Sequence, residues 1–178
     1  MEGRSENMIT VCVRDRLLAI RPIVEDEAGA ALKVYRQCED FLALGPVPTA
    51  SPDMVVKDIE RSRGTGGVFC GIYTADGEMI GIVDYVPGHF DGNPEAALIS
   101  LLMIVESHRN QGIGRAVVEA VERELTEGAP VSMIHTGVQV NNPRAVRFWQ
   151  AQGYRIVSGP ETLSDHTTVY GLRKDVSR

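Results

Sequence analysis

The sequence has few cysteines and no excess of positive charge. Three of its 178 residues are cysteines, Cys12, Cys38 and Cys70, and no two of them form a CxxC pair. An odd number without such spacing favours neither a disulfide framework nor a zinc site, so we expect a reducing, cytoplasmic location. The formal net charge of -6 argues against a protein that grips nucleic-acid phosphates, since that work requires a basic face. A cationic amine is the more natural partner of an acidic chain.

Long apolar runs, targeting signals and metal-ligand spacings are also missing. No apolar run approaches the roughly 18 residues that a membrane-spanning helix needs, and the N-terminus lacks the layout of a signal peptide. The histidines show no HxH or HxxxH spacing. The sequence therefore predicts a soluble protein with no membrane partner, no nucleic-acid partner and no metal.

The hydrophobic pattern predicts one α/β domain. The 178 residues, 43% of them apolar, are enough for one core, which we assign to residues 15–178; the unperiodic residues 1–14 are expected to be a flexible lead-in. Strands are expected over residues 17–23, 67–73, 78–86, 96–105, 131–140, 154–157 and 167–172, and helices over 26–41, from 51 onward, 111–127 and 143–152. This β-α-α-β-β-β-α-β-α-β-β order predicts a mixed, mostly antiparallel central sheet flanked by helices.

A turn that contains glycines leads from the apolar strand 96–105 into the helix 111–127. Backbone N–H groups at a helix start lack intrahelical partners and lie at the positive end of the helix dipole, so a pyrophosphate can bind there. Gly112 and Gly114 allow a close approach, and Arg109 and Arg115 can add charge-assisted hydrogen bonds. The alternative is that the glycines relieve crowding where the helix packs on the sheet.

This turn resembles motif A of the GNAT acetyltransferases, [RQ]xxGx[GA], through Arg109, Gly112 and Gly114. Residues 142–154, NPRAVRFWQAQGY, are similar to the second signature of that family, NxxAxxFYxxxGF. The resemblance covers about residues 17–172 and is specific between about residues 97 and 155. It implies a single GNAT-like domain that acts as an acetyl-CoA-dependent N-acetyltransferase, in which the amine attacks the thioester directly. The implied partner is a small-molecule or peptide amine acceptor.

The resemblance also implies which residues bind acetyl-CoA. Backbone groups of Met103 and Ile104 would pair with the pantetheine arm, and Asn142 would touch the pantetheine or phosphate end. Phe148 would pack near the cofactor, and plain core filling is an equal alternative for it. The pyrophosphate would be held by the segment Arg109, Asn110, Gln111, Gly112, Ile113, Gly114 and Arg115.

One position departs from the family pattern. Many members have a tyrosine after the phenylalanine, which protonates the departing thiolate, and this chain has Trp149 there. An indole N–H is not a useful acid, so packing is the favoured interpretation of Trp149. The departure leaves open a second function, that of a non-catalytic acyl-CoA-binding or regulatory module.

The amine must lose a proton before it attacks, which requires a base near the acetyl carbon. Asp84 and Glu95 are the candidates, and ordinary solvation is the alternative for both. Asp84 ranks first because a period of two places it on one face with Ile80, Ile82 and Val86. Burial on that apolar face would raise its pKa toward neutrality, which suits a base.

The acceptor side and the assembly are less constrained. The segment 35–42 lies where this family usually builds its acceptor pocket, so Glu39 and Asp40 are candidates for contact with a cation. The alternative is a solvated helix end. A homodimer is the commonest closed assembly, and the oligomeric state is left open.

Overall fold

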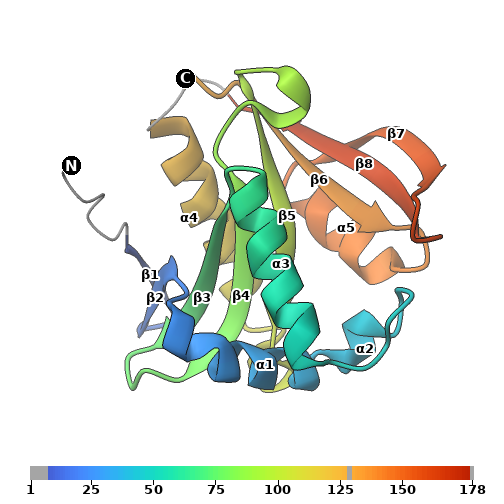
Figure 1. Cartoon of the computed structure of the whole chain (residues 1–178). Helices are drawn as coiled ribbons and strands as arrows, with labels where there is room; N and C mark the ends of the chain where they lie inside the picture. The colour runs from blue at the N-terminus through green and yellow to red at the C-terminus, as the bar shows by residue number, and fades with distance from the viewer. Residues whose placement is uncertain (1–7, 128–129, 177–178) are drawn as a thin grey trace.

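In residues 8–127 and 130–176, which the computed structural model describes, eight strands form one sheet in the order β1-β2-β3-β4-β5-β6-β8-β7 (Figure 1). The strands are β1 (Ile9–Val13), β2 (Arg16–Pro22), β3 (Val68–Thr74), β4 (Met79–Val86), β5 (Ala96–Ile104), β6 (Met133–Gln139), β7 (Arg155–Thr162) and β8 (Thr168–Asp175). The helices are α1 (Ala28–Gln37), α2 (Glu39–Leu42), α3 (Pro52–Gly64), α4 (Ile113–Glu127) and α5 (Pro143–Ala151), with short 3-10 turns η1 (Glu25–Glu27), η2 (Phe90–Gly92) and η3 (Glu106–His108). Neighbouring strands are antiparallel apart from β5 and β6, which confirms the predicted mixed, mostly antiparallel α/β fold.

Helix α4 makes the crossover that allows β5 and β6 to run parallel. The residues with helical spacing, Ile113, Val117, Val121 and Leu125, are buried, as their pattern predicts. Helix α4 covers one face of the sheet, and α1 and α3 lie on the other (Figure 1). The apolar core therefore fills both sides of the central strands.

Strands β5 and β6 pair over a short stretch and then diverge, as Figure 1 shows. Their pairs are Ala96 with Met133, Ala97 with Ile134 and Leu98 with His135. Beyond these pairs β5 keeps β4 as its partner and β6 keeps β8. Each strand thus has one side of its backbone facing a gap at the centre of the sheet.

The predicted lead-in, residues 1–14, contains a strand from Ile9 to Val13, a correction to the sequence-based boundary; residues 1–7 lie outside the described residues. Strand β1 forms a hairpin with β2, and Val11 is buried in the core. The turn is made by Arg14 and Asp15, both with positive φ (46° and 64°). A turn of this kind is usually signalled by glycine or asparagine, and neither residue is present here.

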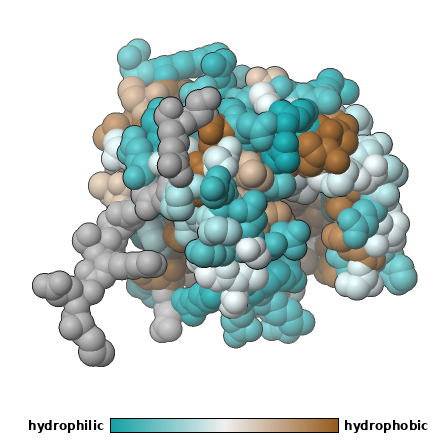
Figure 2. Space-filling model, turned by 90° about the horizontal axis from the view of Figure 1, so that it is seen from above, coloured by the Kyte–Doolittle hydropathy of each residue, from teal (hydrophilic) through white to brown (hydrophobic). Residues whose placement is uncertain are grey.

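The end of the molecule that carries η2 and the start of β5 has a largely hydrophilic surface. Seen from this end, apolar side chains form separate small patches among polar ones (Figure 2). None of the helices in the described ranges combines the length and the apolar composition needed to cross a bilayer.

Gly81 on β4 tests how tightly the central strands pack. A Cβ at this position would lie 2.5 Å from the carbonyl oxygen of Met103 on β5 and 3.0 Å from Cδ1 of Ile72 on β3. Because the first of these atoms is backbone, we expect Gly81→Ala to lower the free energy of unfolding by about 1–3 kcal/mol. The matched control is Gly29→Ala in α1, where a Cβ meets nothing within 4 Å; it should be neutral or stabilising by up to about 1 kcal/mol. Urea unfolding measures both, and equal midpoints for the two variants would contradict this packing.

Candidate active site

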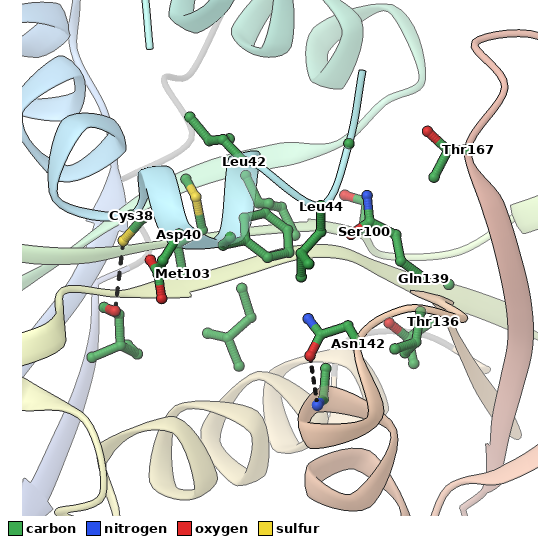
Figure 3. A pocket seen from close by; sticks show the side chains of 18 of the residues that line it. Cys38, Asp40, Leu42, Leu44, Ser100, Met103, Thr136, Gln139, Asn142 and Thr167 are labelled. Carbon is green, nitrogen blue, oxygen red and sulfur yellow. Dashed lines mark hydrogen bonds between the residues drawn. The ribbon is translucent and has the colours of Figure 1, made fainter. Parts of the chain in front are cut away.

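A cavity of about 1360 Å³ opens where β5 and β6 diverge. Its walls come from α2, α3, the start of α4, α5 and the connection between β7 and β8. Figure 3 shows side chains from α2, α5 and β5, among them Leu42, Asn142 and Ser100, around one space. Segments far apart in the sequence thus form one site around the gap in the sheet.

The turn between η3 and α4 presents a row of free backbone donors to this cavity. Within the described ranges, no group accepts a hydrogen bond from the backbone N–H groups of residues 110–115. Asn110 and Gly112 have positive φ (59° and 85°), and this directs successive N–H groups outward. Such a concave row at the positive end of a helix is suited to a phosphate group. All three observations fit the predicted anion site.

The two glycines of the turn have different reasons to be glycine. A Cβ on Gly112 would meet only Cγ1 of Val13 at 3.8 Å, so its positive φ is the constraint. A Cβ on Gly114 would lie 3.4 Å from the ring of Phe148, so close packing against α5 is the constraint there. The alternative that glycine relieves crowding therefore applies to Gly114 and not to Gly112.

The side chain of Arg109 is bound to α2 and to the end of β5. Its Nη1 and Nη2 donate to the carboxylate of Asp40 at 2.5 and 3.0 Å, and its Nε donates to the carbonyl oxygen of Ile104 at 2.7 Å. The hydrogen bonds to Asp40 raise the pKa of Arg109 and lower the pKa of Asp40, despite the opposing effect of burial on each group. In this structure the guanidinium of Arg109 therefore forms an ion pair with α2, and its contact with a phosphate stays a prediction.

Other arginines lie beside the free N–H groups. Arg144 donates to Oδ1 of Asn110 at 3.0 Å, and Arg16 donates to Oε1 of Gln111 at 2.8 Å. Arg115, which the sequence predicts here, is exposed and paired with Glu119 at 2.8 Å. Sequence reasoning missed Arg16, and it also missed Arg144 although that residue lies within the second signature.

The backbone of β5 supplies a second row of groups. Val105 N–H donates to the carbonyl of Ile80 on β4 at 3.0 Å. Because successive residues of a strand direct their N–H and C=O groups to alternate sides, Met103 directs its groups to β4, and Leu102 and Ile104 direct theirs to the gap. The backbone pairing predicted for Met103 is therefore wrong for this geometry, since that backbone lies against β4, and Leu102 takes its place beside Ile104.

Helix α5 forms another wall of the cavity. Asn142 caps it, since its Oδ1 accepts a hydrogen bond from Ala145 N–H at 3.0 Å, and its side chain lines the cavity (Figure 3). Phe148 is half-buried and also lines the cavity, which fits both interpretations of this residue. Trp149 is 6% exposed and stacks edge-on against Phe148 and Tyr154, with ring centroids 5.4 and 4.9 Å away. This is the packing role that the sequence favours for Trp149.

The two candidate bases have different surroundings. Asp84 is 8% exposed and accepts hydrogen bonds from Oγ of Ser62 at 2.6 Å and Oγ of Ser100 at 2.5 Å. Burial raises the pKa of Asp84, and the two hydroxyl groups oppose that shift. Asp84 is not among the residues that line the cavity, whereas Ser100 is (Figure 3). Glu95 is exposed at the start of β5, bound to Ser132 Oγ at 2.7 Å and outside the cavity lining.

Ser100 is a site residue that sequence reasoning missed. It is the only polar residue in the apolar run of residues 96–105, and that contrast is a signal that could have found it. Glu39, a predicted cation contact, instead accepts a hydrogen bond from the backbone of Ala50 at 2.9 Å. Among the described residues, no three His, Cys, Asp or Glu side chains are grouped to hold a metal ion.

Comparisons with known proteins agree with this geometry. The model of the acetyltransferase (GNAT) family matches residues 30–154. The fold is similar to an acetyltransferase from Thermus thermophilus (24% identity, TM-score 0.73, covering 89% of this chain and 97% of that one). It is also similar to the GNAT domain of S. lividans PAT (21% identity, TM-score 0.73, covering 95% of this chain and 97% of that one). A third similar structure is spermidine N-acetyltransferase from Vibrio cholerae in complex with CoA and spermine (14% identity, TM-score 0.66, covering 88% of this chain and 94% of that one). No curated protein matches the sequence significantly. Since the family model covers well over half of the sequence, the chain belongs to the GNAT acetyltransferase family.

Proposed function

We propose that this protein transfers an acetyl group from acetyl-CoA to an amine by direct attack. The observation that carries the proposal is the row of free N–H groups at residues 110–115, which lies beside the unpaired edge of β5 in one cavity. The first suits a pyrophosphate, and the second suits an extended, amide-containing arm. CoA has both parts, and the V. cholerae neighbour of the same fold was solved in complex with CoA.

The chain offers a contact to each part of the cofactor. The N–H groups of residues 110–115 would hold the pyrophosphate, and Arg115 and Arg144 lie close enough in the lining to add positive charge. Backbone groups of Leu102 and the N–H of Ile104 would pair with the pantetheine amides. Phe148 and Asn142 would contact the arm from α5.

In the reaction, the amine nitrogen bonds to the acetyl carbon, the carbon–sulfur bond breaks, and CoA leaves as a thiolate. A thiol pKa near 8.5 makes this thiolate a tolerable leaving group, so a general acid is not required and Trp149 can serve packing alone. The proton of the amine must still be removed. Ser100 faces the cavity and Asp84 accepts its hydroxyl hydrogen bond, so Ser100 can take the amine proton while it gives its own to Asp84.

The charged groups around Asp84 act in opposite directions on its pKa. Asp58 raises it and Arg61 lowers it; both belong to α3, and both effects are smaller than that of burial. Its hydrogen bonds favour the ionised form. An ionised Asp84 can accept a proton, and a protonated one cannot, so turnover should fall as the pH falls through this raised pKa.

A non-catalytic acyl-CoA-binding module is the second candidate, because Trp149 is packed where the family pattern has an acid. Release of free thiol from acetyl-CoA in the presence of a panel of amines distinguishes the two functions. The proposed enzyme releases thiol with at least one amine, and a binding module releases it with none.

Gly112→Glu tests the cofactor site. The new carboxylate would repel the pyrophosphate, so we expect CoA affinity measured by calorimetry to fall by about a hundredfold or more. Gly77→Glu is the matched control, because Gly77 has nearly the same φ (84° against 85°) and nothing within 4 Å of a Cβ. It adds the same charge and the same backbone strain in the β3–β4 turn. Equal CoA affinity of the two variants would show that residues 110–115 do not bind the cofactor.

Asp84→Asn tests the proton acceptor. We expect kcat/KM for an active amine to fall by about 10²-fold or more, because the amide cannot take a proton. The limb of the wild-type pH profile that declines toward acid should disappear, and CoA affinity should be unchanged. Glu95→Gln is the comparison, since neither Glu95 nor its hydroxyl partner Ser132 lines the cavity, whereas Ser100 connects Asp84 to it. If Glu95→Gln loses turnover and the acid limb while Asp84→Asn keeps both, the base is Glu95.

A further inference from the structure

Arg109 belongs to the cofactor motif, and its contacts join two other parts of the molecule. Three of its N–H groups are used, two by Asp40 on α2 and one by the carbonyl oxygen of Ile104 at the end of β5. The two parallel bonds to Asp40 match the fork of a guanidinium to a carboxylate, which is the strongest arrangement for such a pair. The Arg109 side chain is 18% exposed and that of Asp40 is 61% exposed. The arginine is thus held within the protein, with its charge balanced by Asp40.

Helix α2 depends on such contacts. It has four residues, none of them buried, and no side chain caps its start. A helix of that length is not stable alone in water. Besides the Arg109 pair, polar contacts tether this region: Cys38 Sγ lies 3.6 Å from the same Ile104 oxygen, and Asn141 donates to Leu44 O at 3.1 Å. Figure 3 shows Cys38 and Asp40 at one corner of the cavity, beside Met103.

Helix α2 is also a wall of the cavity. Phe41 and Leu42 line it, and Figure 3 shows Leu42 across the cavity from Asn142, which caps α5. The residue after Arg109 is the first of those free donors. One side chain therefore links the turn that carries the free donors to the wall of the cavity formed by α2.

We propose that Arg109 is a positioning residue that fixes α2 and the acceptor-side wall of the cavity against β5, and that it is not a ligand of the cofactor phosphates. The phosphates are held by the N–H groups of residues 110–115 and by arginines that are not bound to Asp40. With three of its five N–H groups bound to Asp40 and Ile104, Arg109 keeps two for another partner, and turning the whole guanidinium toward a phosphate would leave the Asp40 carboxylate unpaired close to an anionic ligand. The cofactor half of this inference rests on the proposed function, and the α2 half does not.

The test compares Asp40→Asn with Arg109→Gln in the full chain. Both variants break the ion pair, so the proposal expects them to behave alike. Amide hydrogen exchange over residues 41–45 should become about tenfold faster or more, because the hydrogen bonds of α2 open locally. CoA affinity by calorimetry should change by no more than about twofold in either variant. With an amine that the enzyme acetylates, the KM for the amine should rise by a larger factor than the factor by which kcat falls.

A phosphate role for Arg109 predicts the opposite pattern. Arg109→Gln would then lose CoA affinity, while Asp40→Asn would free the arginine and keep or increase it, and this divergence would overturn the proposal. So would unchanged exchange of α2 in Asp40→Asn, a result that decides the matter alone if Arg109→Gln does not fold. Asp175→Asn is the control, since it removes the partner of Arg155 in an exposed ion pair of 2.5 Å between β7 and β8. If the wild type binds no CoA, the proposed function fails. The hydrogen exchange of α2 then still tests whether the Arg109–Asp40 ion pair holds this helix in place.

Discussion

Strands β5 and β6 are joined at three residue pairs and then separate, and the rest of the site depends on that separation. Backbone groups inside a sheet need partners, and those of β5 beyond Leu98 have lost a neighbour on one side. An extended ligand can take the place of the missing strand. The same separation creates the cavity, at whose edge the start of α4 presents its free N–H groups. The proposed cofactor site thus results from a break in the regular pairing of the sheet.

The buried carboxylate of Asp84 shows how stability and chemistry are combined near this break. A carboxylate in an apolar interior is costly unless hydrogen bonds satisfy it, and Ser62 from α3 and Ser100 from β5 provide them. Both bonds join different elements, so they also fix α3 and β5 against β4. Burial raises the pKa of Asp84, and the hydroxyl groups limit the increase. The same three side chains therefore stabilise the fold, and two of them, Ser100 and Asp84, form the proton path that we propose.

The sequence predicted the parts of this structure that depend on local pattern. Helix α4 and the turn before it were predictable because periodic apolar residues and two glycines lie in one continuous segment. The side of β5 that faces the gap was not, because it depends on the pairing of Val105 with Ile80, and register is a property of two strands. The partner of Arg109 could not be predicted either, since Asp40 lies 69 residues away in the sequence. Strand β1 was missed because its turn contains no glycine or asparagine.

A binding site built from main-chain groups has an evolutionary consequence. Every residue other than proline has a backbone N–H, so substitutions within residues 110–115 can preserve the donors, provided that position 112 keeps its backbone conformation. The cavity is also lined by side chains such as Phe41, Leu44 and Leu163, which any substitution alters. Main-chain donors are therefore less sensitive to sequence change than the side chains that line the rest of the cavity.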